Sequence, residues 1–368
     1  MNADVLAPLG GVELNSLQFA QDLHRRGHRI DLLYREGGSQ APQWQSVADS
    51  VCRVPAFRLR RRRPVRDVLS VVPSLYLARK LRPDVLYLNR AELLPWGVLA
   101  AKAAGAPLIC HLHHYPDFAG VGQLAGATAR FIAVSTFVKR SWVDAGVPAD
   151  KIDVVHNGVS PEVYRFAGTS DLLAARAELG IAADAVIFLY YGRLNRDKGI
   201  HVLLRAWADV RRRVPSAVLL MLGDFPDDEE GRRYERELTG LGLERSLRFG
   251  NRADVLPFLN ASDVVVLPAE WNEPFGRVVI EAMMTGRPVV ATRSGGIPEI
   301  LTGEFARWVS DKGDPAALGE TLVGLAHWRT TDPDLGRRAR QHVHERFALD
   351  AAVSQVEAIL QRGADARP

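Results

Sequence analysis

Residues 270–301 read EWNEPFGRVVIEAMMTGRPVVATRSGGIPEIL, and this stretch carries the most informative pattern in the chain. It follows the apolar run DVVVLPA, which is typical of a strand buried on both faces of a sheet. Pro274 and Gly276 then mark the start of a helix, whose first backbone N–H groups are available to an anionic or hydroxyl-bearing ligand. A strand, a polar loop and a helix in this order indicate an α/β domain.

Outward from this stretch, short apolar runs alternate with helix-like segments such as 13–26, 92–104 and 200–213. Continuous apolar runs between amphipathic helices predict parallel sheets that are covered on both faces. The turn signal Asn157-Gly158 interrupts the series once. The strand-like runs lie at 5–7, 30–34, 51–55, 85–89, 108–113, 131–135 and 152–156 before it, and at 186–191, 218–222, 247–250, 264–267, 289–292 and 308–310 after it.

This interruption predicts two α/β domains, at residues 1–158 and 159–346, followed by a helical segment at 347–368. The length of 368 residues suits two domains of ordinary size. Hydrophobic residues make up 47% and charged residues 24% of the chain, which excludes a disordered or fibrous protein. In open parallel sheets, ligands bind at the carboxyl ends of the strands, so functional residues are expected there.

The basic residues are mostly arginine, which accounts for 41 of 47, and the net charge of +4 is weak for a nucleic-acid-binding protein. Six arginines fall within nine residues at Arg58–Arg66, RLRRRRPVR. Such a run suits an anionic acceptor or a peripheral contact with membrane headgroups, although a solvated loop is the simpler interpretation.

The cysteine count and the absence of a targeting pattern predict a cytoplasmic protein. Cys52 and Cys110 are too few for a disulfide framework, which favours a reducing compartment. The first residues lack a basic region followed by an apolar stretch, and no apolar run is long enough to span a membrane.

Glu273 and Glu281 are the first candidate site residues. Glu273 precedes the helix and Glu281 lies about one and a half turns inside it, so both can face a ligand at the helix N-terminus. By itself, the pair is also explained by one partner for the helix dipole and one solvated residue.

The segment YYGRLNRDKG at 190–199 holds a second pair of candidates. Arg193 and Lys198 bracket the turn between a strand and a helix, a place where two cations suit a diphosphate. Ordinary surface cations explain the pair as well. Gly10 and Gly11 follow the first strand, where they permit either close approach to a ligand or a plain tight turn.

Three histidines stand at the end of a first-domain strand, in LICHLHHY at 108–115. Strand alternation puts His111 and His113 on one face. A metal pair is possible in principle, but no carboxylate or cysteine lies close in sequence. A contact with substrate is the preferred hypothesis.

Taken together, these motifs resemble the family-4 glycosyltransferases, retaining enzymes of the GT-B fold. The resemblance rests on GGVE at 10–13 before a helix ending RRGHRI, AVS at 133–135, VVHNGV at 154–159, GRLNRDKG at 192–199 and EPFGRVVIEAMMTGRPVVATRSGGIPEI at 273–300. It implies two Rossmann-like domains that face each other across a cleft, with the final helix returning to the first domain. The first strand is shorter than this pattern implies, which would fit a start further upstream.

The resemblance also implies roles for the donor-binding residues. Glu273 would hold hydroxyls of the donor sugar, helped by the backbone amides of Phe275 and Gly276. Glu281 would bind the ribose of the nucleotide. The diphosphate would be neutralised by Arg193 and Lys198 and touched by Gly11.

His113 matches the family histidine near the transferred sugar, with His111 and His114 as alternatives. The donor would be a UDP- or GDP-type sugar, and neither a metal nor another cofactor is expected. The acceptor, either a small molecule or a glycan, would be bound by first-domain loops. A metal-dependent enzyme would need a D-x-D motif, and the one match, Asp332-Pro333-Asp334, precedes a helix that Asp334 is expected to cap.

The sequence therefore predicts a cytoplasmic hexosyltransferase-type enzyme that moves a sugar from a nucleotide donor to a hydroxyl. Alternatives are a nucleotide-sugar epimerase or hydrolase on the same fold, and a non-catalytic sugar-binding protein.

Overall fold

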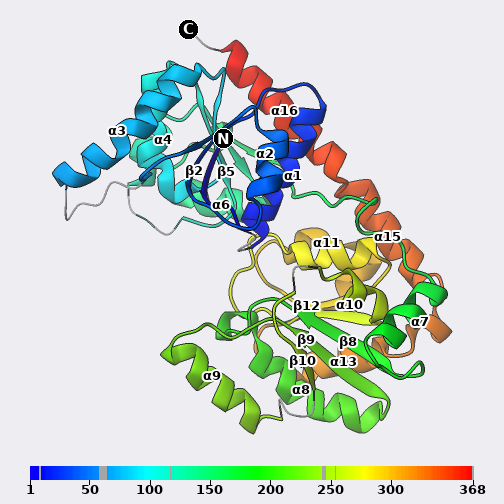
Figure 1. The fold of residues 1–368 in the computed structure, drawn as a ribbon. Coiled ribbons are helices and arrows are strands. Elements are labelled where there is room, and N and C mark those ends of the chain that lie inside the picture. The colour runs from blue at the N-terminus through cyan, green and yellow to red at the C-terminus, as the bar shows by residue number, and fades with distance from the viewer. Residues whose placement is uncertain are drawn as a thin grey trace. The chain divides into compact units, whose positions relative to one another are not determined.

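The computed structural model describes residues 1–7, 10–57, 64–116, 118, 120–242, 246–252 and 254–366. Its contacts divide the chain into two compact units, each with its own parallel sheets (Figure 1). Unit 1 comprises Met1–Gly158 and Leu349–Pro368, and unit 2 comprises Val159–Ala348. Of the arginine run Arg58–Arg66, residues 58–63 lie outside the described part, as do the side chains of the rest.

The strands of unit 1 form two parallel ladders, as the prediction of parallel strands requires. One has the order β1-β2-β3 and the other β4-β5-β6-β7. The strands are β1 (Asn2–Val5), β2 (Asp31–Glu36), β3 (Ser50–Arg53), β4 (Leu86–Leu88), β5 (Leu108–Leu112), β6 (Arg130–Ala133) and β7 (Ile152–Val154).

The first strand lies three residues earlier than the apolar run at 5–7 predicted. Its pairing with β2 begins at Asn2, opposite Leu33, and the backbone N–H of Leu6 still donates to Glu36 O at 3.0 Å. The apolar run therefore marks only the buried end of the strand, where Leu6 is 1% exposed.

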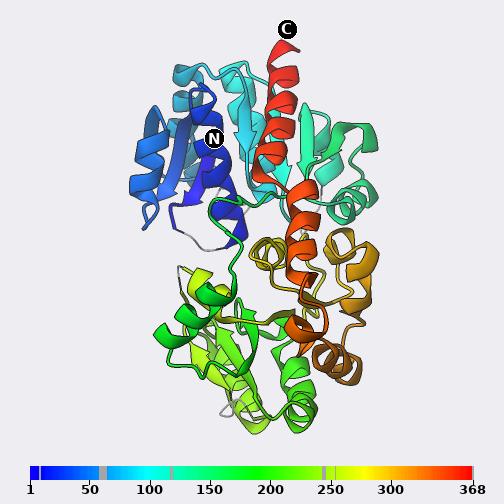
Figure 2. The same ribbon diagram turned by 90° about the vertical axis from the view of Figure 1, so that its right-hand side faces the viewer.

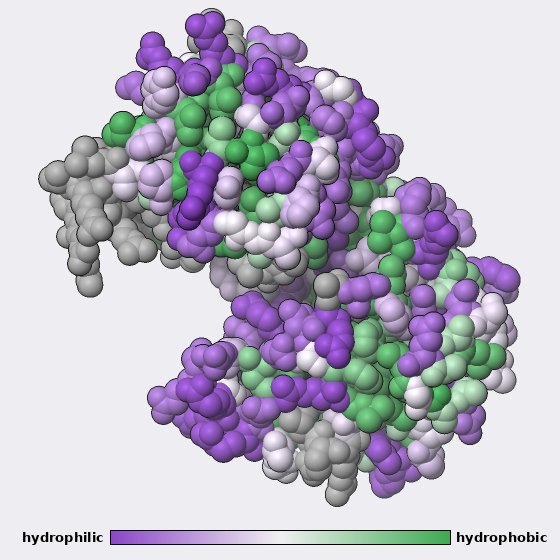
Figure 3. All heavy atoms as spheres, in the orientation of Figure 1, coloured by the Kyte–Doolittle hydropathy of each residue, from purple (hydrophilic) through white to green (hydrophobic). Residues whose placement is uncertain are grey.

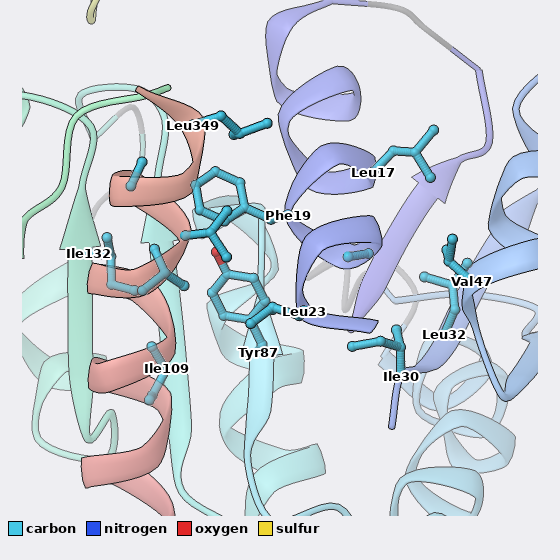
Figure 4. Close-up of a cluster of buried hydrophobic side chains, with 14 of the residues drawn as sticks. Leu17, Phe19, Leu23, Ile30, Leu32, Val47, Tyr87, Ile109, Ile132 and Leu349 are labelled. Carbon is cyan, nitrogen blue, oxygen red and sulfur yellow. The ribbon is translucent and has the colours of Figure 1, made fainter. Parts of the chain in front are cut away.

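One hydrophobic cluster joins the two ladders and their helices into a single core (Figure 4). Phe19 and Leu23 of α1 lie beside Tyr87 of β4 in this cluster, which also includes Ile109 of β5. The helices of unit 1 are α1 (Gly11–Arg25), α2 (Ala41–Val47), α3 (Pro64–Leu81), α4 (Leu94–Ala104), α5 (Val121–Ala125), α6 (Thr136–Asp144) and α16 (Leu349–Asp365), with short 3₁₀ turns at Ala91–Leu93 and Ala149–Lys151.

The final helix, α16, packs on unit 1, beside α1 (Figure 2). Its apolar face, including Val353 and Val356, is buried in the core of that unit. Glu357 adds polar contacts, since Arg26 Nη1 lies 2.7 Å from Oε2 and His28 Nε2 lies 2.6 Å from Oε1. Periodicity alone does not show which surface this helix covers.

Unit 2 holds one six-stranded parallel sheet with the order β10-β9-β8-β11-β12-β13. The predicted runs at 186–191, 264–267 and 289–292 coincide with β8, β11 and β12. The order reverses between β8 and β11, which makes the carboxyl ends of these two strands the switch point where open α/β sheets bind ligands. The strands are β8 (Val186–Tyr191), β9 (Ala217–Leu222), β10 (Leu247–Phe249), β11 (Val264–Leu267), β12 (Val289–Thr292) and β13 (Val309–Ser310).

The helices of unit 2 follow from capping and amphipathic patterns. In α9, for example, the side chain of Asp228 accepts from Gly231 N at 2.7 Å, and Tyr234 and Leu238 are buried while the charged residues give a hydrophilic surface (Figure 3). The helices are α7 (Thr169–Glu178), α8 (Ile200–Arg213), α9 (Glu229–Gly240), α10 (Leu256–Ala261), α11 (Arg277–Met284), α12 (Ile297–Ile300), α13 (Pro315–Leu325), α14 (Trp328–Thr331) and α15 (Leu335–Arg346), with 3₁₀ turns at Arg196–Lys198 and Gly303–Trp308. Within the described ranges, no helix is long and apolar enough to cross a membrane.

Candidate active site

The loops that follow β8 and β11 are joined at the switch point of unit 2. Asp197 O, in the first loop, accepts from the backbone N–H of Glu270 at 2.8 Å and from that of Trp271 at 3.1 Å. Because these strands are neighbours in the sheet, residues separated by more than seventy positions in sequence come into contact here.

Two glycines permit this close approach. Gly199 has φ +71°, and a Cβ at that position would stand 1.8 Å from Pro268 O. Gly295, in the GGIPE segment, has φ +50°, and its Cβ would stand 2.0 Å from Glu273 O. Neither position accommodates a side chain without moving the backbone, so the two glycines are structural requirements of the loops that carry Lys198 and Glu273.

Lys198 and Glu273 are in direct contact. Lys198 Nζ lies 2.6 Å from Glu273 Oε2, and the two side chains are 15% and 14% exposed. The indole N–H of Trp271 donates to the same carboxylate oxygen at 2.8 Å. The ammonium also lies 4.6 Å from the centre of the Trp271 ring, within the range of a cation–π contact. The candidate cation and the candidate carboxylate therefore belong to one cluster with Trp271.

The backbone around Glu273 is held by the segment that follows β12. Glu273 N donates to Ser294 Oγ at 3.0 Å, and Ser294 Oγ donates to Trp271 O. Glu273 O accepts from Gly296 N at 2.8 Å. The GGIPE segment thus fixes the position of the glutamate through main-chain contacts.

Glu281 lies in a second cluster, on α11. Gly276 caps this helix with φ +103°, so Glu281 is placed one turn inside it. Arg277 Nε donates to Glu281 Oε1 at 3.1 Å, and Tyr191 Oη lies 3.0 Å from Oε2. The carboxylate is 6% exposed, and protein groups bond to each of its oxygens.

Two tyrosines near Glu281 have raised pKa values. Burial raises the pKa of Tyr191 and of Tyr164 well above the ordinary value, and the negative charge of Glu281 raises both further. Both hydroxyls therefore remain protonated at neutral pH. A protonated Tyr191 can donate to the carboxylate of Glu281.

Arg193 and Phe275 complete the predicted set in unit 2, in different environments. Arg193 follows β8 and is exposed, while Tyr190 Oη donates to its carbonyl at 2.7 Å and so fixes the backbone there. The Phe275 side chain is buried, and its ring lies 5.7 Å from that of Phe347. The structure thus brings Lys198 and Glu273 together and places Glu281 with Arg277.

In unit 1, a pocket of about 120 Å³ lies at the carboxyl ends of β4 and β5. His113 and His114 line it, together with Val12 near the start of α1, which begins at Gly11. Arg90 pairs with Glu13 and also with Glu92, at 3.0 Å, and Trp142 Nε1 donates to His114 O at 2.7 Å. The remaining wall comes from Asn89, Ala91, Tyr115 and the Trp142 ring.

His111 lies under this pocket and does not line it. The ring is 1% exposed, 4.2 Å from that of His113, and its Nδ1 lies 2.6 Å from Tyr87 Oη. The stacking confirms that His111 and His113 share a face. Burial lowers the pKa of His111 to about 3, so the ring is neutral. His111 is thereby a core residue, and the histidines at the pocket are His113 and His114.

Both aspartates of the D-x-D match form ion pairs with arginines. Asp332 Oδ2 lies 2.7 Å from Arg338 Nη2, and Asp334 Oδ1 accepts from Arg337 at 2.9 Å. Asp334 occupies the N-cap position of α15, as expected, but its side chain bonds to Arg337 instead of to a helix amide.

Sequence reasoning missed Trp271, Tyr191, Arg277 and Ser294. Tyr191 and Trp271 lie in motifs already singled out, YYGRLNRDKG and EWNEPFG, where an aromatic residue next to charged groups is a usable signal. Arg277 stands four residues before Glu281, the spacing of a helical ion pair. For Ser294 no signal exists, because its partners are backbone groups distant in sequence.

Comparisons with known proteins agree with this architecture. The family model described as Glycosyltransferase Family 4 matches residues 9–163, and the one described as Glycosyl transferases group 1 matches residues 173–342. The lipopolysaccharide 1,2-N-acetylglucosaminetransferase of Salmonella typhimurium is 30% identical over 203 residues, covering 53% of this chain and 51% of that protein. A D-inositol 3-phosphate glycosyltransferase of Saccharomonospora viridis is 28% identical over 92% of this chain and 86% of its own.

Solved structures show the same fold. The crystal structure of Anabaena HepE matches with a TM-score of 0.82 and 24% identity over 98% of both chains. The chain therefore has the GT-B fold of two Rossmann-like domains. Its first part matches the family-4 model and its second part the group 1 model, so it belongs to the family-4 glycosyltransferases.

Proposed function

We propose that this protein transfers a sugar from a nucleotide-diphosphate sugar to an acceptor hydroxyl, with retention of anomeric configuration and without a metal ion. The observation that carries the proposal is the contact between Lys198 and Glu273 at the switch point of unit 2. A cation for the leaving diphosphate and a carboxylate for sugar hydroxyls stand side by side, as the donor requires.

Each donor-binding role follows from the chemistry of the group. Lys198 and Arg193 neutralise the diphosphate, since both follow β8 at the switch point. Glu273 accepts hydrogen bonds from hydroxyls of the donor sugar, with the amides of Phe275 and Gly276 at the start of α11. Glu281 accepts from the ribose.

The chemical step depends on electrostatic stabilisation. Cleavage of the anomeric C–O bond leaves negative charge on the diphosphate and positive character on the sugar ring. Cations at the diphosphate therefore stabilise the transition state more than the ground state. The acceptor hydroxyl attacks from the face that the diphosphate leaves, and the diphosphate accepts its proton.

The acceptor is proposed to bind in the pocket of unit 1. His113 and His114 stand there with Tyr115 and Glu92, a mixture of aromatic and polar groups that suits a hydroxyl-bearing ring.

The thiols of Cys52 and Cys110 are unpaired, which supports a reducing compartment such as the cytoplasm.

A thermal-shift screen of nucleotide sugars tests the donor assignment. UDP-glucose comes first, because a structure of the similar protein HepE was solved with UDP-glucose. A donor present at about 100 times its Kd stabilises the folded state by roughly 2.7 kcal/mol, an easily measured shift. Stabilisation by nucleotide sugars, but not by the free sugars, is expected.

Product analysis tests the reaction itself. With an acceptor found by screening, the anomeric configuration read by NMR is expected to match that of the donor, and EDTA is expected to leave the rate unchanged. An inverted product or a rate abolished by EDTA would contradict the mechanism. Release of sugar at the same rate with and without acceptor would instead indicate a hydrolase.

A further inference from the structure

Trp271 contacts both members of the Lys198–Glu273 pair through different parts of its indole. The ring N–H donates to Glu273 Oε2 at 2.8 Å, and the ring face lies 4.6 Å from Lys198 Nζ. An N–H donor orients a carboxylate, while the face of an aromatic ring attracts a cation. One side chain thus positions an anion with its edge and a cation with its face.

The backbone N–H and the backbone carbonyl of Trp271 are both hydrogen-bonded. Trp271 N donates to Asp197 O at 3.1 Å, in the loop that carries Lys198, and Trp271 O accepts from Ser294 Oγ, which also binds the backbone of Glu273. The side chain is therefore anchored to the same two segments whose charges it contacts.

This arrangement decides which atoms remain for a donor molecule. In the described part of the chain, Lys198 and Trp271 both bond to Oε2 of Glu273. Oε1 is then the oxygen left to accept from sugar hydroxyls. The ammonium of Lys198 has three N–H groups and uses one on Glu273, so two remain for phosphate oxygens.

We propose that Trp271 is a positioning residue that orients Glu273 for the donor sugar with its N–H and Lys198 for the diphosphate with its ring face. This inference rests on the proposed function, which assigns the sugar to Glu273 and the diphosphate to Lys198. It predicts that the two effects separate when the N–H is removed and the ring is kept.

Calorimetric titrations of Trp271→Phe and Trp271→Leu separate these effects. The probes are UDP and UDP-glucose, or the nucleotide pair that stabilises the wild type most in the thermal-shift screen. Trp271→Phe keeps a ring face but loses the N–H, so the Kd for the nucleotide sugar is expected to rise about five- to tenfold. The Kd for the nucleoside diphosphate is expected to stay within about twofold, because the Phe face still serves Lys198.

Trp271→Leu removes the ring face as well. We expect it to raise the Kd for the nucleoside diphosphate about threefold or more, beyond the effect of Trp271→Phe. Equal losses for both ligands in Trp271→Phe, or no loss for either, would overturn the role of the N–H. Equal diphosphate affinities of the Phe and Leu variants would overturn the role of the face.

Trp308→Phe is the matched control. Trp308 lies in the same unit, and its ring neighbours are Arg307 at 5.1 Å and Phe305 at 5.4 Å, neither of which is a candidate site residue. Neither Kd is expected to change in this variant. The melting temperature of each variant shows whether a change in affinity reflects loss of folding.

Glu273→Ala distinguishes a failure of this inference from a failure of the proposed function. If Glu273→Ala leaves the Kd for the nucleotide sugar unchanged, the sugar assignment is wrong. If it weakens binding while Trp271→Phe does not, the sugar assignment stands and only the role of Trp271 is wrong.

Discussion

The loops at the switch point of unit 2 and the pocket of unit 1 are built in different ways. In unit 2, the candidate residues bond to one another, as Lys198 does to Glu273 at 2.6 Å. In unit 1, Arg90 at the pocket pairs with Glu92, and Trp142 donates to the backbone carbonyl of His114. The comparison teaches that the candidate side chains of unit 2 orient one another, whereas in the pocket of unit 1 His114 is positioned through its backbone carbonyl.

Lys198→Ala is the strongest test of the candidate site in unit 2. Removing a preorganised cation from developing charge is expected to lower kcat/KM by about 10²–10³-fold. The loss also leaves Glu273 without its ion pair. Steady-state kinetics measures the effect, with Lys312→Ala as a control, because Lys312 lies near the same loop and bonds to Asn272. An unchanged kcat/KM would refute the diphosphate assignment.

Gly199→Ala tests whether close backbone approach builds the site. A Cβ there would overlap Pro268 O, so a loss of about 3 kcal/mol or more in the free energy of unfolding is expected. Gly180→Ala is the matched control, because Gly180 has φ +68° with nothing within 4 Å, and it should cost about 1 kcal/mol. Urea denaturation measures the loss of stability in both variants. Equal losses would show that the close approach to Pro268 does not add to the cost of a side chain at Gly199.

The buried histidine of unit 1 predicts a pH dependence. The pKa of His111 is about 3 in the folded chain, against 6.5 for an ordinary histidine. Between these values the unfolded chain binds a proton that the folded chain does not, so stability falls as the pH decreases from 6.5 towards 3. At pH 5 this group accounts for a loss on the order of 2 kcal/mol relative to neutral pH.

His111→Gln removes this titration while keeping an acceptor for Tyr87. Urea denaturation at pH 7 and pH 5 is expected to show a smaller drop in stability for the variant than for the wild type. The contributions of all other ionisable groups are common to both proteins and cancel in the comparison. The same drop in both would mean that His111 is accessible to protons in the folded state.

Glu281→Ala gives the smallest expected effect. The ribose contact is similar in the ground and transition states, so the KM for the donor is expected to rise about tenfold with little change in kcat. Tyr191→Phe, which removes one hydrogen bond to Glu281, should shift the KM in the same direction by less. A loss confined to kcat would contradict the ribose assignment.

Sequence patterns predicted the strand positions of unit 2 more accurately than those of unit 1. In unit 2, three of the predicted runs coincide with β8, β11 and β12. In unit 1, the first strand begins with polar residues, so the apolar run placed it three residues late. The strands of this unit form two ladders, and which strands pair depends on contacts between segments that local patterns do not contain.

The candidate site also contains some residues that local patterns predict and others that only the fold distinguishes. The order and spacing of GRLNRDKG and EPFG selected Lys198, Glu273 and Glu281, because glycines, a helix start and charged residues leave a local record. The same patterns could not distinguish His111 from His113, since alternation gives a face but not a depth of burial.

The sequence by itself determined the α/β class, the two-part organisation and the motif residues, since hydrophobic periodicity and turn chemistry are local properties. Tertiary structure alone decided which residues of unit 1 pack against α16, that Trp271 contacts both Lys198 and Glu273, and that Ser294 holds their loop. These contacts join segments from different strands of a sheet. Their formation depends on strand order and backbone approach, which no short stretch of sequence encodes.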